Sequence, residues 1–470
     1  MTMKRPNEQS WTIRPTTHAK SLTSRAQLWR RCPSSAYIGR AVGLEFGRRI
    51  CFLGLLGCLA LVSQAVFAAA PAYEITIRAG AYDRINVPVM ISIPDFVVPA
   101  QPVSVQLTDA NGTRIPAQLT GPRLLAAKST GAEIHFILNK LNAGQSMQLK
   151  ATFSNEHQLT ESAYVWRDKP GLSTELHFGN RPILRYHYEQ LDESTPESRV
   201  RTYKPFHHVF SPLGDRIVTN GLSEAPNIHS PHHRGIYFGF NRITYGNGKK
   251  ADTWHCIDGA YQEHKRILAS EAGPVMGRHR VVIGWHGNDE HKQPFAEEQR
   301  ELAVYNVSGG HLIEFASRMK TTGGRVRLDG DPQHAGFQFR AHNDVDVSTT
   351  QETIYVRTDG VGKPGDTRNW EPSTRQGPTN LPWNAMSFVL GGKRYTMAYL
   401  DRPQNPKEAR FSERNYGRFG SYFEYTLDEG TPPLEVNYRL WLQYDLMAPA
   451  DVAKLSRDFV EPIDLSVRTN

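Results

Sequence analysis

Short segments in which apolar and polar residues alternate dominate the chain from residue 71 onward. The first of them are Tyr73–Arg78, Val103–Leu107, Glu133–Ile137 and Ser146–Phe153. Alternation with a period of two, broken at intervals by Gly, Pro or Asn, is typical of antiparallel β-structure. The pattern therefore predicts a small β-sandwich domain over residues 71–160.

The same alternation continues in longer segments through the rest of the chain. The clearest are Ile183–Tyr188, Gly235–Phe240, Arg280–Trp285, Glu301–Tyr305, His311–Arg318, Gly336–Arg340, Tyr395–Leu400 and Leu434–Leu442. Helical spacing of apolar residues occurs convincingly only in Pro449–Phe459. Such a run of strands without a repeat period favours one large two-sheet β-sandwich over a propeller. We therefore predict an all-β chain whose large domain spans residues 161–470.

Residues 1–70 have the composition of a leader rather than of a domain. Arg48 and Arg49 precede an uncharged apolar stretch from Ile50 to Ala70 that ends in small residues. A basic segment, an apolar segment and an Ala-rich end predict a cleaved export signal at about residues 48–70, and hence a periplasmic or secreted protein. An uncleaved membrane anchor is the alternative, because the apolar stretch is just long enough to span a bilayer. Residues 1–46 precede this signal, either as a long basic extension or because translation starts later.

The positive charge of the chain is confined to this leader. The whole sequence has a net charge of +8, and residues 1–70 contain ten Lys and Arg but only two acidic residues. The remaining 45 basic and 45 acidic residues balance. Bulk charge therefore gives no reason to expect nucleic acid as a partner, nor a membrane surface for the mature form unless the leader is retained.

Histidine is the residue that points to chemistry. Thirteen of the 18 histidines lie between Arg201 and Val345. The densest segment is His229-Ser-Pro-His-His-Arg-Gly235, directly before an apolar strand. Pro231 and Gly235 constrain this loop, so that His229, His232, His233 and Arg234 would project from the start of the strand. Imidazoles serve in proton transfer and as metal ligands, although an exposed polar turn would have the same composition.

Two acidic and aromatic segments follow this loop. In Asp252-Thr-Trp254, the carboxylate and the indole share one face of an extended segment, an arrangement that suits a sugar ring. Glu263 and His264 point to opposite faces, so only one of them would face a given cavity. Ordinary strand packing with charged outer positions is the alternative for both segments.

Later segments add guanidinium, amide and phenol groups. In His334–Arg340, polar residues including His334 and Arg340 share one strand face, which is either the wall of a site or the solvent side. Asn405 lies in the loop Asp401–Pro406, and Arg414 and Tyr416 lie shortly after it. An arginine can bind a carboxylate through two hydrogen bonds, and a tyrosine can relay a proton.

These segments together resemble the bacterial family labelled "methane oxygenase PmoA-like". The resemblance covers about Thr202 to Leu446 and rests on the following motifs: Pro205–Gly214, His229–Gly235, Asp252–Trp254, Glu263-His264, Gly336–Arg340 and Asp401–Pro406. It implies an exported protein with a β-supersandwich similar to that of galactose mutarotase and several polysaccharide lyases. The family label itself implies a copper or iron oxygenase.

The sequence favours an exported carbohydrate-active enzyme of lyase or hydrolase type that removes a proton next to a carbonyl or carboxylate of an oxidised or acidic sugar. His232 or His264 would be the base, and Tyr416 or Glu263 the acid. Arg234 and Arg340 would stabilise negative charge, or one divalent metal held by His229, His232 and His334 would do so, with an open coordination position. Trp254, Asp252, Arg340, His334, Asn405 and Arg414 would bind the substrate. A non-catalytic glycan-binding protein and a metal-dependent oxygenase are the alternatives.

Overall fold

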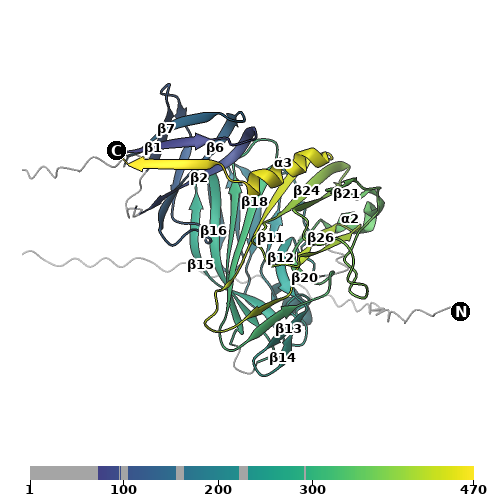
Figure 1. Cartoon of the computed structure of the whole chain (residues 1–470). Coiled ribbons are helices and arrows are strands. Elements are labelled where there is room, and N and C mark those ends of the chain that lie inside the picture. Colours follow the sequence, from purple (N-terminus) through teal and green to yellow (C-terminus); the bar gives the residue numbers. More distant parts are fainter. Residues whose placement is uncertain are drawn as a thin grey trace, which may run out of the picture. The chain divides into compact units, whose positions relative to one another are not determined.

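The structure, a computed structural model, describes residues 72–94, 96, 104–154, 163–221, 231–289 and 293–469. These residues form mostly antiparallel β-strands and confirm the predicted all-β class, a small sandwich followed by a large two-sheet sandwich (Figure 1). The predicted leader, His229 and the expected domain boundary near residue 160 lie outside the described residues. Among the described helices, none is long and apolar enough to cross a membrane.

The small sandwich consists of one five-stranded and one three-stranded sheet. The five-stranded sheet has the order β29-β1-β7-β3-β4, and the other has the order β2-β6-β5. Their bounds are β1 Tyr73–Arg78, β2 Arg84–Pro94, β3 Ser104–Asp109, β4 Arg114–Ile115, β5 Ala117–Thr120, β6 Thr130–Leu141, β7 Ser146–Ser154 and β29 Asp464–Thr469. Both sheets contribute to one apolar core that includes Ile75, Val89 and Phe136. The alternation in β1 and β7 reflects burial of one face of the five-stranded sheet, whereas β6 of the other sheet is buried on both faces from Ala132 to Phe136.

The C-terminal strand belongs to the small sandwich, although the sequence pattern placed it with the large one. β29 pairs antiparallel with β1 along its whole length, from Tyr73 opposite Thr469 to Arg78 opposite Asp464. Leu465 and Val467 pack against the core of the small sandwich. The local alternation is that of any strand, and pairing across nearly four hundred residues leaves no local signal in the sequence.

The large sandwich is built from an eight-stranded and a nine-stranded sheet. The eight-stranded order is β25-β26-β20-β12-β11-β10-β9-β8, and the nine-stranded order is β15-β16-β17-β18-β28-β24-β23-β21-β22. The first sheet contains β8 Tyr164–Lys169, β9 Ser173–Phe178, β10 Arg181–His187, β11 Phe206–Val209, β12 Ile236–Phe240, β20 Ala335–Arg340, β25 Arg410–Arg414 and β26 Arg418–Tyr422. The second contains β15 Tyr261–Ala272, β16 Met276–His286, β17 Ala296–Tyr305, β18 His311–Thr321, β21 Ile354–Arg357, β22 Gly360–Val361, β23 Trp383–Leu390, β24 Lys393–Asp401 and β28 Leu434–Tyr444.

Aromatic residues join the two large sheets. Phe238 of β12 meets Trp285 of β16 with ring centroids 5.7 Å apart, and Phe337 of β20 meets Phe315 of β18 at 4.3 Å. Because side chains alternate along a strand, Tyr237 of β12 and Arg340 of β20 point to the outer face of the eight-stranded sheet. This outer face is covered by loops, so that every residue of β12 and β20 is buried.

A smaller sheet and three α-helices complete the large sandwich. The four-stranded sheet contains β13 Arg242–Tyr245, β14 Lys249–Ala251, β19 Val326–Asp329 and β27 Tyr425–Leu427. The predicted helix is present as α3, Pro449–Val460, with Val452 and Phe459 buried. The helices α1, Pro196–Thr202, and α2, Asn343–Ser348, and a 3-10 turn at Thr350–Glu352 are too short to give a helical period in the sequence.

Candidate metal centre

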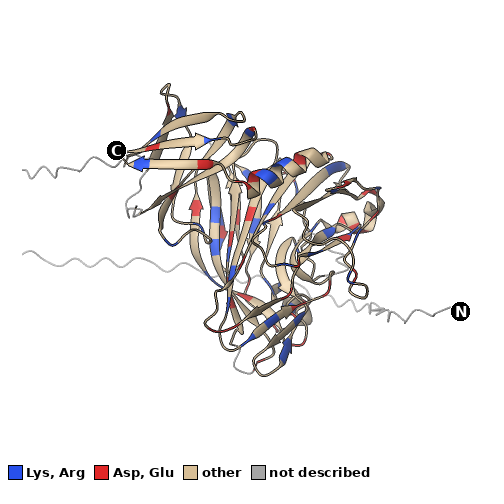
Figure 2. Cartoon of the chain, in the orientation of Figure 1, with Lys and Arg blue, Asp and Glu red and all other residues tan. Residues whose placement is uncertain are grey.

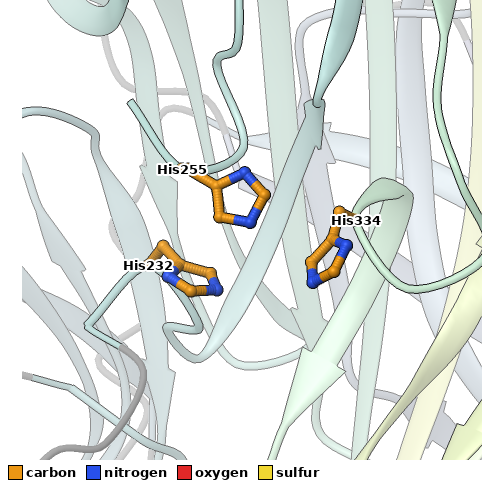
Figure 3. A group of neighbouring side chains, drawn as sticks. All are labelled: His232, His255 and His334. Atoms are coloured by element: carbon orange, nitrogen blue, oxygen red, sulfur yellow. The ribbon is translucent and has the colours of Figure 1, made fainter. Parts of the chain in front are cut away.

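Three histidines from separate segments meet over the outer face of the eight-stranded sheet. His232 lies in the loop before β12, His255 in the turn after β14, and His334 directly before β20. One ring nitrogen from each lies within 4.8 Å of the others (Figure 3). Two nitrogens that share one zinc ion at about 2.0–2.1 Å can lie at most about 4.2 Å apart, so the rings would have to move closer together to bind one ion.

Carboxylates orient two of the three rings. His255 Nδ1 lies 2.7 Å from Asp252 Oδ2, and His334 Nδ1 lies 2.9 Å from Asp331 Oδ1. An ionised carboxylate only accepts hydrogen bonds, so each Nδ1 carries the proton and each Nε2 offers its lone pair. Carboxylate–histidine pairs of this kind accompany most histidine metal ligands, because they fix the tautomer and the ring orientation.

The carboxylates themselves are held in place. Asp252 Oδ1 accepts hydrogen bonds from the backbone N–H groups of Trp254 and His255, at 3.0 and 2.8 Å. Asp331 accepts one from Asn241 at 2.7 Å. Burial would raise the pKa of Asp331, but its hydrogen bonds from His334, Gln333 and Asn241 lower it well below its usual value. Both carboxylates are therefore part of a built arrangement.

The third ring, His232, is kept neutral by its surroundings. Burial lowers its pKa to about 2, and the nearby Lys204, His255 and His334 add to this effect. Its ring centroid lies 4.5 Å from that of His255 and 6.2 Å from that of His334. A neutral imidazole is the form that binds a metal ion. Three nitrogen ligands suit zinc, copper, iron or nickel and leave further positions open for water or substrate.

A glycine folds the His232 loop back over the sheet. Gly235 has φ = +48°, and a Cβ at this position would lie 1.9 Å from the carbonyl oxygen of His207. Arg234 fixes the same loop, because its guanidinium donates to the carbonyl oxygens of Pro231, Arg201 and Val200 and lies over the ring of Tyr203. The sequence predicted that Arg234 stabilises negative charge on a substrate, whereas its guanidinium binds backbone carbonyls and so positions the loop of His232.

Several buried polar groups around the three histidines lack hydrogen-bond partners among the described residues. His233 is only 3% exposed, and neither of its ring nitrogens has a partner. Its centroid lies 4.2 Å from His232, and its ring is nearly parallel to that of His334 at 6.2 Å. The hydroxyl of Tyr237 and the indole nitrogen of Trp254 also lack partners. Buried polar atoms are rarely left unpaired, so this cluster indicates a place where water or a ligand binds.

Tyr416 stands beside this cluster with its hydroxyl on a buried arginine. Its ring lies nearly parallel to His233 at 6.1 Å, and Arg418 Nε donates to its oxygen at 3.1 Å. Burial would raise the pKa of Tyr416, but Arg418, Arg340 and Arg414 together lower it. A phenol with a lowered pKa exchanges a proton more readily near neutral pH.

A buried lysine lies on the other side of the cluster. Lys204 donates to the carbonyl oxygen of Trp254 and lies 5.1 Å from the ring centroid of Tyr237. Burial lowers its pKa to about 8. Next to His232 and His255 opens a cavity of about 780 Å³, lined also by Tyr203 and by Arg199 of α1. The site therefore combines three imidazoles, buried cations and a space large enough for a sugar.

The structure brings some predicted residues together with this site. His232, His334, Asp252, Trp254 and Tyr416 belong to it. Arg340 contacts Tyr416 through its ring, at 4.9 Å, and pairs with Asp346 of α2 at 3.1 Å, so it holds Tyr416 in place. Arg414 donates to Asn369 at 2.6 Å and borders the site, where it contributes to the lowered pKa of Tyr416.

Other predicted residues make their contacts elsewhere. His264 hydrogen-bonds Tyr186 at 3.1 Å, and Glu263 pairs with Lys265 and His286. Asn405 is buried and bonds Asp401 and the backbone of Asn437. No contact within the described part of the chain joins these three residues to the metal centre. The candidate ligand His229 lies outside that part.

Sequence reasoning missed His255 and Asp331, although a signal for both was present. Asp252-Thr-Trp-His255 and Asp331-Pro-Gln-His334 are two Asp-x-x-His segments with the same spacing. In both, the carboxylate reaches the Nδ1 of the histidine three residues later. Lys204 and Arg418 gave no comparable signal, because a cation in an apolar strand or loop is commonplace.

Comparison with known proteins places most of the large sandwich in a family. The model of the "Family of unknown function (DUF6807)" matches residues 173–457, which include every residue of the candidate metal centre. No curated protein matches the chain. Among solved structures, the chain is similar to a protein in the glycosyl hydrolase family 38 from Enterococcus faecalis, with 9% identity and a TM-score of 0.41 over 86% of this chain and 48% of that one. The chain thus spans about half the length of that protein.

Proposed function

The chain belongs to the DUF6807 family, a family of unknown function, and we propose that it is an exported, metal-dependent carbohydrate-active enzyme of lyase or hydrolase type. Its substrate is a glycoside whose sugar carries a carbonyl or a carboxylate. The observation that carries the proposal is the group His232, His255 and His334, two of whose members are oriented by Asp252 and Asp331. Histidines that only pack in a core do not need to converge or to be oriented by carboxylates. Histidines that bind a metal ion with open coordination positions do.

The charge of the surroundings supports an oxidised or acidic sugar. Lys204, Arg418 and Arg340 are buried near the three histidines, and only Arg340 has a carboxylate partner among the described residues. Burying a cation without a counter-charge is costly, so an anionic or strongly polarised ligand would relieve this cost. The unpaired groups of His233, Tyr237 and Trp254 would bind hydroxyl groups of the same ligand.

The chemistry proceeds next to the carbonyl or carboxylate of the sugar. A metal ion held by His232, His255 and His334 would supply a Lewis acid that stabilises the negative charge developing on that oxygen. Tyr416, as phenolate, takes the proton from the neighbouring carbon. The electron pair of the broken C–H bond then forms a C=C bond as the glycosidic C–O bond breaks, and the departing oxygen receives the proton from Tyr416. The step is redox-neutral, and its product is an unsaturated sugar plus the free alcohol.

The test uses the full chain loaded, in separate preparations, with zinc, copper, iron or nickel. Glycosides with a carbonyl or carboxylate in the sugar are compared with the same glycosides in neutral, unoxidised form, and release of the alcohol is measured. We expect turnover of the first group alone. Removal of the metal by a chelator and His255→Ala should both abolish it, and Tyr416→Phe should lower kcat with little change in KM, since the phenol acts in the transition state.

The alternatives give different results in the same experiment. If the protein binds the glycosides but none of its metal-loaded forms turns them over, the result would favour a glycan-binding protein. Consumption of oxygen together with oxidation of the substrate would favour a copper or iron oxygenase, as the resemblance to the PmoA-like family implies. Equal turnover before and after complete metal removal would reject the metal-dependent mechanism.

Export is a part of the proposal that rests on the sequence of residues 48–70 alone. Its test is cell fractionation of the natural host, with N-terminal sequencing of the mature protein. Cleavage near Ala68–Ala70 and recovery outside the cytoplasm are expected. A cytoplasmic protein that retains residues 1–70 would contradict it.

A further inference from the structure

A second polar cavity lies where the small sandwich meets the large one. It has a volume of about 150 Å³, and β2 and the loop after β5 contribute to it from the small sandwich. From the large sandwich, β18, β28, α3 and the segment after β24 line it. Basic and acidic positions lie close together on the strands of this region (Figure 2). None of the residues of the metal centre lines this cavity.

Three arginines line this cavity: Arg123, Arg402 and Arg439. Arg402 donates to Asn437 Oδ1 at 3.0 Å, and Arg123 contacts the sulfur of Met90. Neither has a carboxylate partner among the described residues. Arg439 pairs with Glu314 at 2.9 Å, but its Nε is buried and without a hydrogen-bond partner.

The two carboxylates of the cavity are already neutralised. Glu314 is bound by Arg439, and Asp458 of α3 pairs with Arg84 at 3.0 Å and with Lys454 at 2.9 Å. Glu314 also attracts Arg123 and Arg402 electrostatically, but no carboxylate among the described residues forms a hydrogen bond or ion pair with either of them, so one carboxylate is shared by three arginines. Like charges raise each other's free energy at such short range, because the local dielectric constant is low.

The other carboxylates near the cavity do not pair with Arg123 or Arg402 through their side chains. Arg278 and Arg280 lie there, but Glu301 binds Arg280 at 2.6 Å, and Glu271 binds Arg278. Glu133 accepts from the backbone N–H of Arg123 at 3.1 Å and lies 3.4 Å from Arg278. These carboxylates are thus engaged by other donors.

We propose that the cavity between the two sandwiches binds a small oxyanion, such as sulfate, phosphate or the carboxylate of a sugar acid, through Arg123, Arg402 and the free Nε of Arg439. The volume is far larger than the ~10–15 Å³ that one water molecule needs. Guanidinium groups bind carboxylate and tetrahedral oxyanions through paired hydrogen bonds. The bound anion links Arg123 of the small sandwich to Arg402 and Arg439 of the large one, and so stabilises their interface.

Isothermal titration of the full chain with sodium sulfate, sodium phosphate and sodium glucuronate, in sodium chloride of matched ionic strength, tests this site. We expect saturable binding of one equivalent of at least one of the three anions. The anion that binds most tightly identifies the chemical source. Arg402→Gln should weaken its binding at least tenfold. The matched control Arg318→Gln, at an exposed pair with Glu435 on the same sheet, should change the affinity less than twofold.

Absence of saturable binding of all three anions to the unmodified protein would overturn the proposal, as would equal affinity of the Arg402→Gln variant. If that variant does not fold, Arg402→Lys and a selenate soak of crystals of the unmodified protein decide the question. An anomalous selenium peak between Arg123 and Arg402 is the expected result, and an empty cavity would reject it. The site shares no residue with the metal centre, so loss of one proposal leaves the other standing.

Discussion

Two groups of histidines in the large sandwich have the same residue type but opposite environments. His207, His264 and His279 lie inside the sandwich, where His207 Nε2 contacts His279 Nε2 at 2.9 Å and His264 bonds the hydroxyl of Tyr186. His232, His255 and His334 lie on the outer face beside an open cavity. Each inner ring uses one nitrogen in these contacts, while Nδ1 of His207 and of His279 has no hydrogen-bond partner among the described residues, and Trp166 stacks on His279 at 4.9 Å.

The difference lies in the partners rather than in the histidines. In the outer group, carboxylates bind Nδ1 of two rings and leave Nε2 free. In the inner group, the ring nitrogens contact neutral partners, namely another imidazole or the hydroxyl of Tyr186. Histidine density alone therefore does not identify a metal site. A histidine that binds a metal differs from a core histidine in two features: a carboxylate bound to one ring nitrogen, and an accessible space next to the other.

Replacement of one of the three histidines of the outer group should cause the largest loss of metal affinity. His255→Ala removes one of three donors, so zinc or cobalt affinity should fall more than the ~10–100-fold expected for an outer partner. Isothermal titration of metal into the apo-protein measures this. His279→Leu, in the inner group, is the control and should bind one equivalent as the unmodified protein does. Equal metal affinity of His255→Ala and the unmodified protein would remove the distinction between the groups.

Loss of the orienting carboxylates should have the next largest effect. Asp252→Asn and Asp331→Asn each keep the shape of the side chain but remove the charge that fixes the Nδ1–H tautomer. Metal affinity should fall about 10–100-fold for each variant. Asp428→Asn, at an exposed pair with Arg325, provides a control that should not change it. An unchanged affinity in both site variants would show that the carboxylates do not act on the ligands.

The inner group should respond through stability and not through metal. His279→Leu leaves His207 Nε2 without its partner, so the free energy of unfolding should fall by about 1–2 kcal/mol. Chemical denaturation of the apo-protein measures the change. Metal affinity should stay within twofold of the unmodified protein. A metal affinity that fell with stability would show that the two groups are one coupled system.

The inner group should also make stability depend on pH. Burial lowers the pKa of His279 to about 3 and that of His264 to about 4 in the folded protein. The unfolded chain therefore binds these protons first, as pH falls below about 6.5, and the folded protein loses stability from there down to about pH 3 to 4.

For His279 the slope is at most about 1.4 kcal/mol per pH unit. Denaturation of apo-protein and of the His279→Leu variant over this range should show a shallower decline for the variant. Identical slopes would mean that His279 takes up its proton in the folded state as easily as in the unfolded one.

The fold was accessible to sequence reasoning because alternation is a local property. Every strand predicted from it is present, and so is helix α3, Pro449–Val460. The membership of β29 in the small sandwich was not accessible, because a strand's partner depends on distant residues. The export signal and the resemblance to the PmoA-like family stay predictions.

The site was accessible only in part. His232 and His334 were named from a constrained loop and a polar strand face, and the repeated Asp-x-x-His spacing would have added His255. Arg234 was wrongly expected to face the substrate, because the sequence does not show that its guanidinium binds backbone carbonyls of neighbouring segments. His264 was predicted as a possible base, and the sequence does not show its hydrogen bond to Tyr186 because that residue is distant in the chain.

The most direct test of the metal centre is anomalous diffraction from crystals grown with one equivalent of zinc or cobalt. The account predicts one strong peak at about 2.0–2.1 Å from a ring nitrogen of each of His232, His255 and His334. A well-ordered site without a peak, or a peak bound elsewhere while these three rings stay unliganded, would contradict it.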